Sequence, residues 1–275
     1  MSTALLVVVA ALWGAAAGAL LPRAAYRFSV PDEEGEEQEE GEKAQNPEEA
    51  EEAEKAEEET EEGWRERCPA GHPIEGWFGG WVGRARCGAC ATGTPYGPGA
   101  PTLVTVTALV CAALAAATGT RPEVGAWLLL APVGVLLAAV DVRVRRLPDP
   151  LTLPLAGAAL LLLGLVALVP EHAGDWPTAL WATFALGAGY YVLHLINPAG
   201  MGFGDVKLAL AAGAVLGWYG WATVMLGTFA GFLFGALYGW GRVLIRRAGR
   251  KSAIPFGPFL LAGVFVGLLI GAYAA

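Results

Sequence analysis

Two aspartates stand at the ends of strongly apolar segments of this chain. Asp205 opens one such segment in the heptapeptide GFGDVKL (202–208), and Asp141 ends another in VDVRVRRLPD (140–149). A carboxylate is costly to bury in a membrane, and its presence there points to function. Two carboxyl groups can hydrolyse a peptide bond, one acting ionised as general base and the other protonated as general acid. The pair therefore predicts acid–base chemistry on a peptide bond.

The same residues also have structural interpretations, which the sequence alone leaves open. Asp205 follows a glycine and precedes an apolar run, as a helix N-cap does, and Asp141 can pair with Arg143 or Arg145 at a helix end. Lys207 can bias Asp205 towards ionisation. Asp149, between two prolines, is interpreted as a turn residue that caps the next helix.

The composition is that of a membrane protein. Hydrophobic residues make up 55% of the 275 residues and charged residues only 16%, far from the balance of soluble domains. The sequence predicts an all-α, polytopic membrane helical bundle of about eight transmembrane helices, since a helical span takes roughly 17–25 residues. The expected spans are 4–21, 102–118, 124–140, 151–169, 178–196, 219–240 and 256–274, with a shorter eighth at 206–216.

Basic residues orient these spans, because Lys and Arg in short loops mark the cytoplasmic side. Arginines cluster at 143–146 and again at 242–250, whereas the loop 170–177 has neither Lys nor Arg. Eight alternating spans then put both termini outside and both aspartates on the cytoplasmic side. The first span is interpreted as an uncleaved anchor; the alternative is a signal peptide, whose basic n-region it lacks.

A highly acidic segment follows the first span. Residues 32–62 carry 18 Asp or Glu and two Lys, a net charge of −16, against −8 for the whole chain. Such a segment buries too little apolar surface to fold and is expected to be a solvated tether. Electrostatic attraction of basic substrate segments is the alternative.

Three cysteines and a histidine follow the tether. The motif CPAGH (68–72) is separated from CGAC (87–90) by a spacing typical of a zinc knuckle, with Cys68, His72, Cys87 and Cys90 as ligands. A metal-free, vestigial loop and a Cys87–Cys90 disulfide are the alternatives. Cys111 lies within an apolar span and is expected to be a packing residue.

The chain resembles the type IV prepilin peptidases, a family of intramembrane aspartyl proteases. Their pattern, D-x5-6-LPD-x-LT-x-P followed by G-x-G-D-x-K-L, is matched here by residues 141–154 and 202–208. The resemblance implies that Asp141 and Asp205 are the catalytic pair of an aspartic endopeptidase. It also implies substrates: prepilins or pseudopilins, whose short basic leader is cut at the cytoplasmic face of the bacterial inner membrane, just before their hydrophobic helix.

The resemblance extends over nearly the whole chain. It implies an N-terminal transmembrane anchor (1–27), a cytoplasmic cysteine segment (64–100) and an intramembrane peptidase core (101–275). The acidic disordered linker (28–63) between anchor and cysteine segment is an insertion relative to the family pattern. Proteolysis needs no cofactor. Some relatives also methylate the new N-terminus with S-adenosylmethionine; family members usually have a fourth cysteine, and its absence here bears on methylation more than on proteolysis.

Two other classes of protein share some of these features. A proton- or cation-coupled transporter also needs intramembrane carboxylates, but it holds them near mid-bilayer and often shows inverted repeats. A non-enzymatic assembly protein of a pilus or secretion machine would use the cysteine segment for docking. The bilayer is a predicted partner and nucleic acid is not.

Overall fold

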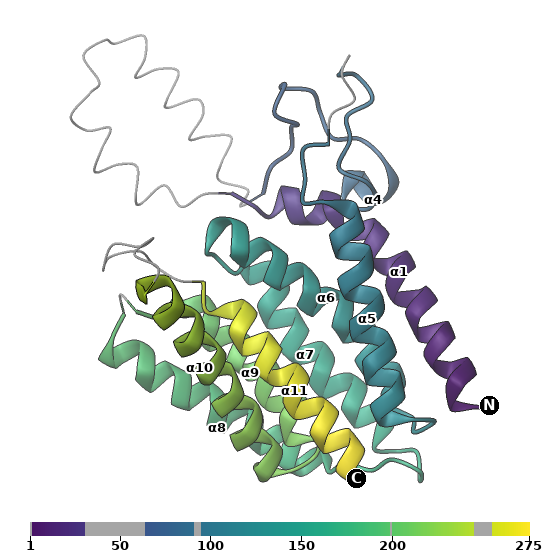
Figure 1. Cartoon of the computed structure of the whole chain (residues 1–275), viewed down its shortest axis with the longest axis vertical. Coiled ribbons are helices and arrows are strands. Elements are labelled where there is room, and N and C mark those ends of the chain that lie inside the picture. Colours follow the sequence, from purple (N-terminus) through teal and green to yellow (C-terminus); the bar gives the residue numbers. More distant parts are fainter. Residues whose placement is uncertain (1, 31–63, 91–94, 199, 245–254) are drawn as a thin grey trace.

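A computed structural model describes residues 2–30, 64–90, 95–198, 200–244 and 255–275. In these ranges the chain is helical and has no strands. Two isolated β-bridges lie in the cysteine segment. This confirms the predicted all-helical bundle (Figure 1). The helices are α1 (Thr3–Arg27), α4 (Trp77–Gly80), α5 (Ala100–Thr118), α6 (Glu123–Val144), α7 (Asp149–Val166), α8 (Trp176–Ile196), α9 (Phe203–Gly217), α10 (Trp221–Leu244) and α11 (Gly257–Ala274).

Seven of the described helices are long and apolar enough to cross a membrane: α1, α5, α6, α7, α8, α10 and α11. The chain is therefore a multi-pass membrane protein. The eighth predicted span corresponds to α9, which has 15 residues and a length of about 22 Å. Nearly all of α9 is buried, against α7, α8, α10 and α11. It forms the centre of the bundle and is shielded from lipid by its neighbours.

Glycines set the closest helix contacts. A Cβ on Gly14 would lie 2.6 Å from the carbonyl oxygen of Thr107, and one on Gly18 would lie 2.7 Å from that of Leu103. The backbones of α1 and α5 therefore touch along one turn, as small residues permit in membranes. Cys111 is fully buried in α5 beside this contact, in agreement with its predicted packing role.

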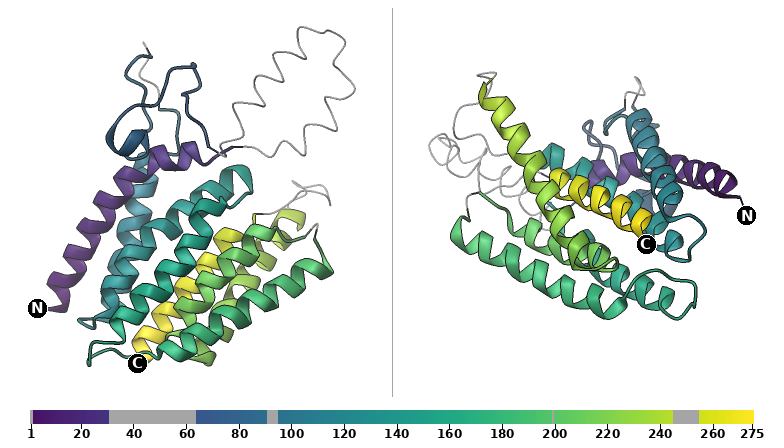
Figure 2. Two further views of the ribbon diagram at one scale, coloured as in Figure 1. Left: turned by 180° about the vertical axis from the view of Figure 1, so that it is seen from behind. Right: turned by 60° about the horizontal axis from the view of Figure 1, so that its bottom comes forward.

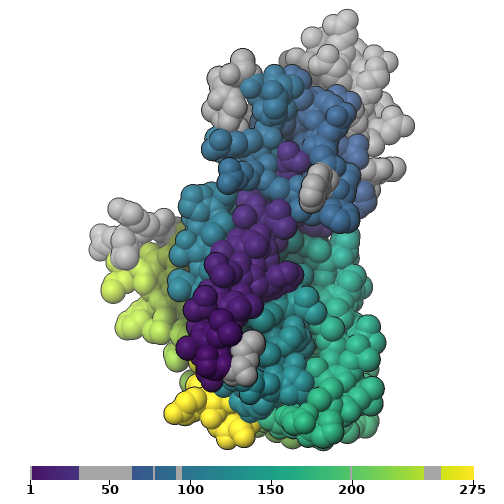
Figure 3. Space-filling model, turned by 90° about the vertical axis from the view of Figure 1, so that its right-hand side faces the viewer, coloured from purple at the N-terminus to yellow at the C-terminus, as the bar shows by residue number. Residues whose placement is uncertain are grey.

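The cysteine segment docks on the C-terminal part of α1, where Pro22 lies within the helix. Gly83 inserts there, because its amide donates to the Leu20 carbonyl at 3.0 Å and its carbonyl accepts from the Arg23 amide at 3.1 Å. The Arg23 side chain donates to the carbonyls of Arg84 and Glu75 at 2.9 and 3.0 Å. The space-filling view shows this segment seated on the end of α1 (Figure 3).

The two ends of the bundle differ. The start of α1 and the end of α11 lie together at one end, and the cysteine segment lies at the other, in both the front and the rear view (Figures 1 and 2). The acidic tether (32–62) and residues 245–254 of the basic loop after α10 fall outside the described residues.

Candidate active site

Asp141 lies in the last turn of α6, at the same end of the bundle as the cysteine segment. Arg145 ends the helix in a left-handed conformation with φ 55°, and its amide donates to the backbone carbonyl of Asp141 at 2.8 Å. The Asp141 side chain is 3% exposed. Its Oδ2 accepts the backbone N–H of Gly257, at the start of α11, at 3.0 Å. Within the described part of the chain, Asp141 does not form the ion pair with Arg143 or Arg145 that was the alternative, and α11 orients the carboxyl group instead.

Asp205 lies in the first turn of α9, three residues after the N-cap, Gly202. The N-cap interpretation of Asp205 is therefore wrong, because Gly202 is the N-cap and the Asp205 side chain lines the polar cavity. The residue is 7% exposed. Gly204 presses against Leu147, since a Cβ at 204 would approach the Leu147 Cβ to 2.9 Å. The loop between α6 and α7 thus packs directly on the start of α9.

One polar cavity of about 280 Å³ contains both aspartates. Its walls come from the end of α6, the following loop and the start of α9, and the two carboxyl groups interact electrostatically. The structure therefore brings together the two residues that the sequence singled out. They lie at one end of the bundle rather than at its middle, unlike the arrangement expected of a transporter.

The predicted capping role of Asp149 is wrong. Pro148 is the N-cap of α7, and no side chain caps the helix. The Asp149 carboxylate instead forms an ion pair with Lys207 Nζ at 2.5 Å, at the edge of the cavity. Lys207 and Asp205 are two residues apart on α9, so they project to different sides of the helix. Lys207 therefore links α7 to α9 through Asp149. This ion pair competes with the expected effect of Lys207, which was to favour the ionised form of Asp205.

Two further residues at this site were not anticipated from the sequence. Gly257 supplies the amide that orients Asp141, but a backbone donor 116 positions away has no sequence signature. Tyr190 on α8 is 1% exposed, and it interacts electrostatically with Asp205. Its hydroxyl has no hydrogen-bond partner within the described part of the chain. In the sequence, a single tyrosine in an apolar helix is indistinguishable from a packing residue. Only the fold shows that Tyr190 lies near Asp205.

The four predicted metal ligands converge in the cysteine segment. Their ligand atoms all lie within 4.8 Å of one another. The Cys68 Sγ lies 3.8 Å from the Cys90 Sγ and 3.6 Å from the His72 Nδ1, which is 3.5 Å from the Cys90 Sγ. Tetrahedral zinc, with Zn–S of about 2.3 Å and Zn–N of about 2.0 Å, requires ligand separations of about 3.5–3.8 Å. The cluster therefore fits a four-coordinate metal ion.

The cysteine chemistry supports the same geometry. All four cysteines of the chain are free, so the Cys87–Cys90 disulfide alternative is wrong. Burial opposes ionisation of the Cys68 thiol, but hydrogen bonds from the backbone at Ala70 and His72 prevail and lower its pKa to about 6. A thiolate is the form that binds metal.

Comparisons with known proteins agree with the motifs. The pattern of the type IV leader peptidase family matches residues 128–240, which contain both aspartates. The prepilin leader peptidase/N-methyltransferase of Aeromonas hydrophila is 36% identical over 210 residues, 72% of this chain and 66% of that protein. Proteins of the same name from Stutzerimonas stutzeri and Pseudomonas aeruginosa are 31% and 32% identical, over 74% of this chain and 71% of each relative.

The chain spans just under two thirds of the length of the Aeromonas relative. No solved structure matches it. The motifs, the buried aspartate pair and these relatives lead to one conclusion: the chain belongs to the type IV leader peptidase family.

Proposed function

We propose that this protein is a prepilin leader peptidase, an aspartic endopeptidase that removes the leader of prepilin- or pseudopilin-like substrates. The observation that carries the proposal is the pair of buried carboxyl groups, Asp141 and Asp205, in one polar cavity. A buried carboxyl pair is the arrangement that lets one group be ionised while the other keeps its proton. The names of the relatives supply the substrate class.

The chemistry follows from the pair. The ionised carboxylate takes a proton from a water molecule, whose oxygen then bonds to the carbonyl carbon of the scissile peptide bond. The protonated carboxyl gives its proton to the amide nitrogen as the carbon–nitrogen bond breaks. The leader leaves with a new carboxyl terminus and the remainder with a new amine. The Gly257 amide keeps the Asp141 carboxyl in one orientation throughout.

The aspartate end of the bundle is assigned to the cytoplasmic side of the bacterial inner membrane. The arginines at 143, 145 and 146 follow Asp141 directly, and positive charge marks the cytoplasmic side. A leader would then enter the polar cavity from the cytoplasm, while the bundle holds the rest of the substrate in the bilayer.

The metal cluster is assigned to structural zinc. Cys68, His72, Cys87 and Cys90 would fill all four positions of the ion, leaving none for a reacting water. The zinc would therefore stabilise the cysteine segment. It would take no part in hydrolysis, because a closed site cannot bind the reacting water.

Co-expression with a candidate prepilin tests the function, with leader loss read by mass spectrometry. Asp141→Asn and Asp205→Asn are each expected to abolish cleavage while the protein still inserts in the membrane, because both ionisable groups are needed. Near wild-type cleavage by either variant would remove that residue from the catalytic pair. A further mass gain of one methyl group on the product would show that the N-methyltransferase activity in the names of the relatives is present here.

A further inference from the structure

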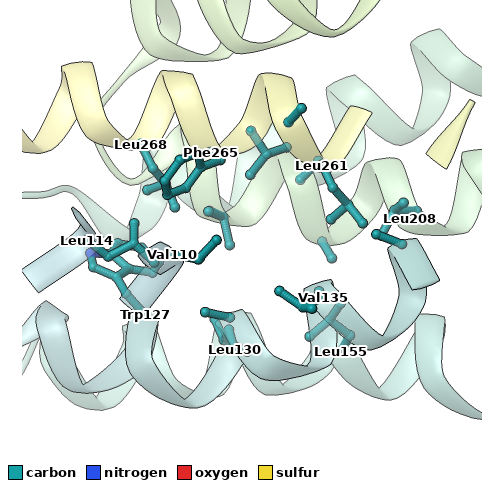
Figure 4. A pocket seen from close by; sticks show the side chains of 18 of the residues that line it. Val110, Leu114, Trp127, Leu130, Val135, Leu155, Leu208, Leu261, Phe265 and Leu268 are labelled. Atoms are coloured by element: carbon teal, nitrogen blue, oxygen red, sulfur yellow. The ribbon is translucent and has the colours of Figure 1, made fainter. Parts of the chain in front are cut away.

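A second cavity, of about 300 Å³, lies inside the bundle and is apolar throughout. It is bounded by α5, α6, α7, α9 and α11 (Figure 4). Within the described ranges no charged residue lines it, and the indole nitrogen of Trp127 is the one polar side-chain atom among its lining residues. On α6 it extends from Trp127 to Ala138, about 16 Å at the rise of an α-helix. We call this cavity the apolar groove.

The apolar groove ends at the candidate active site. Ala138 precedes Asp141 by three residues on α6, and Leu208 follows Asp205 by three residues on α9. Each aspartate therefore lies one helical turn from a residue of the groove, on the same side of its helix. Pro258, also in the lining, follows the glycine whose amide binds Asp141. The groove therefore ends one helical turn from each carboxyl group of the polar cavity.

The shape of the groove indicates what it receives. A volume of about 300 Å³ is too small to enclose a helix, whose diameter with side chains is about 10–12 Å. It is sufficient for the side chains along one helix face. Small residues on three of its walls, among them Gly134, Ala212 and Ala262, permit close approach of a helix. Val106, which lines the groove from α5, is 41% exposed, so the groove is accessible from outside the bundle there.

We propose that the apolar groove binds the transmembrane helix of the substrate, on the carboxyl side of the scissile bond. A chain that leaves the aspartate pair into this groove enters hydrocarbon, where its backbone must satisfy its own hydrogen bonds and therefore be helical. An amino-terminal leader stays in the polar cavity, so the segment after the scissile bond faces the groove. This assignment rests on the proposed function.

Gly134→Leu is the variant that tests the groove. A Cβ at 134 would meet only the Leu261 Cδ2, at an ordinary 3.7 Å, so a side chain fits without moving the backbone and fills the groove. Gly157→Leu on α7 is the matched control, because Gly157 is exposed and its Cβ would meet nothing within 4 Å. Both variants replace a helical glycine by the same residue, so their effects on helix propensity match.

Two substrates separate binding in the groove from chemistry. In Gly134→Leu, one aliphatic side chain of the substrate should lose its binding position in the groove. The KM for a full-length substrate should therefore rise about tenfold or more. A soluble peptide that spans the cleavage site and lacks the apolar helix should be cleaved at the wild-type rate by both variants. Equal cleavage of the full-length substrate by Gly134→Leu and Gly157→Leu would overturn the groove assignment and leave the peptidase function intact. A wild type that cleaves neither substrate would overturn the peptidase function itself.

Cross-linking tests the groove without relying on turnover. A photoreactive phenylalanine at Val106 of the Asp205→Asn variant should cross-link to the full-length substrate, whereas one at Leu109, 65% exposed on the same helix, should not. Cross-links to lipid alone at Val106 would mean that the groove holds an acyl chain, and would overturn the assignment.

Discussion

The carboxyl group of Asp141 has little freedom, because a glycine lies against it. A Cβ at position 257 would come within 2.7 Å of Asp141 Oδ2, and one at position 204 within 2.9 Å of the Leu147 Cβ. We predict that Gly257→Ala and Gly204→Ala each lower kcat by about a hundredfold, the loss expected when a reacting group moves by about 1 Å. Leader cleavage by purified variants measures the effect.

Gly202→Ala is the control for this prediction. The nearest atom to a Cβ at 202 is Asp205 Oδ2 at 3.8 Å, and the backbone there has an ordinary φ of −66°. In the absence of substrate, Gly204 is therefore required for packing and Gly202 is not. Gly202→Ala should accordingly keep the wild-type kcat. A large rise in KM in this variant would show that the substrate backbone, rather than the fold, requires the space at 202.

The ion pair of Asp149 and Lys207 joins the starts of α7 and α9 at the edge of the polar cavity. The Asp149 side chain is 61% exposed and the Lys207 side chain 17%, so the pair contributes no more than about 1 kcal/mol. Asp149→Asn and Lys207→Gln should each lower cleavage by at most about fivefold. The charge swap Asp149→Lys with Lys207→Asp should recover most of that loss. A Lys207→Gln enzyme that is inactive, and is not rescued by the swap, would instead indicate that the ammonium group contacts substrate.

A functional residue could be predicted from the sequence where its expected burial is by itself unusual for its type. Asp141 and Asp205 stood out because a carboxylate within apolar sequence is costly unless it has a function. The partners of these residues were not predictable. The Gly257 amide and the Leu147 contact at Gly204 depend on how α11 and the α6–α7 loop pack, and neither a backbone N–H nor a missing side chain identifies its partner in sequence. The predicted role of Asp149 was wrong for the same reason, because its partner Lys207 lies on a different helix.

At the scale of helices, the sequence predicted each span because hydrophobic runs ended at Gly, Pro or charge. The expected 206–216 segment corresponds to α9, although its 15 residues are few for a span. Its burial explains this length, because a central helix contacts helices rather than lipid over most of its surface. The kink of α1 and the docking of Gly83 there were not predicted, since a proline shows where a helix is interrupted but not which segment fills the gap.

We expect the cysteine segment to depend on a bound metal ion for its fold, because the described part of it has only one short helix and two isolated bridges. Cys87→Ser combined with Cys90→Ser should remove about one equivalent of zinc per chain, measured by metal analysis. The segment should also become accessible to protease. Cleavage should persist, reduced only through lost stability, since the aspartates supply the acid and the base in the proposed mechanism.

Two results would contradict this view of the cluster. Wild-type protein purified without chelator and free of zinc would favour the vestigial, metal-free loop. Complete loss of cleavage in a double variant that still folds would show that the cysteine segment acts in hydrolysis or in leader binding.

At the scale of the whole molecule, helices α8 to α11 alternate in direction, so that the loop before α8 and the end of α11 lie at the same end of the bundle (Figure 2). The arginines after Asp141 lie at the opposite end, which the charge rule assigns to the cytoplasm. A membrane-impermeant maleimide should therefore label Ala173→Cys and Ala274→Cys in intact cells. Asn197→Cys should be labelled only after permeabilisation. These three positions are exposed. The native cysteines are the matched control, since they lie in the cysteine segment, at the end of the bundle that we assign to the cytoplasm, or buried in α5.

The pattern of labelling separates two errors. Labelling of Asn197→Cys alone in intact cells would keep the alternation but invert the orientation, and the arginines would then no longer explain the topology. Labelling of Ala173→Cys without Ala274→Cys would mean that an odd number of the helices α8 to α11 cross the membrane. The short helix α9 would then be the one that fails to cross. Asp205, in the first turn of α9, would still lie at the cytoplasmic end, because the crossing by α8 that precedes it is unchanged. That result would therefore overturn the eight-helix topology and leave the common cavity of the two aspartates intact, whereas the inverted orientation would move both aspartates to the outer face.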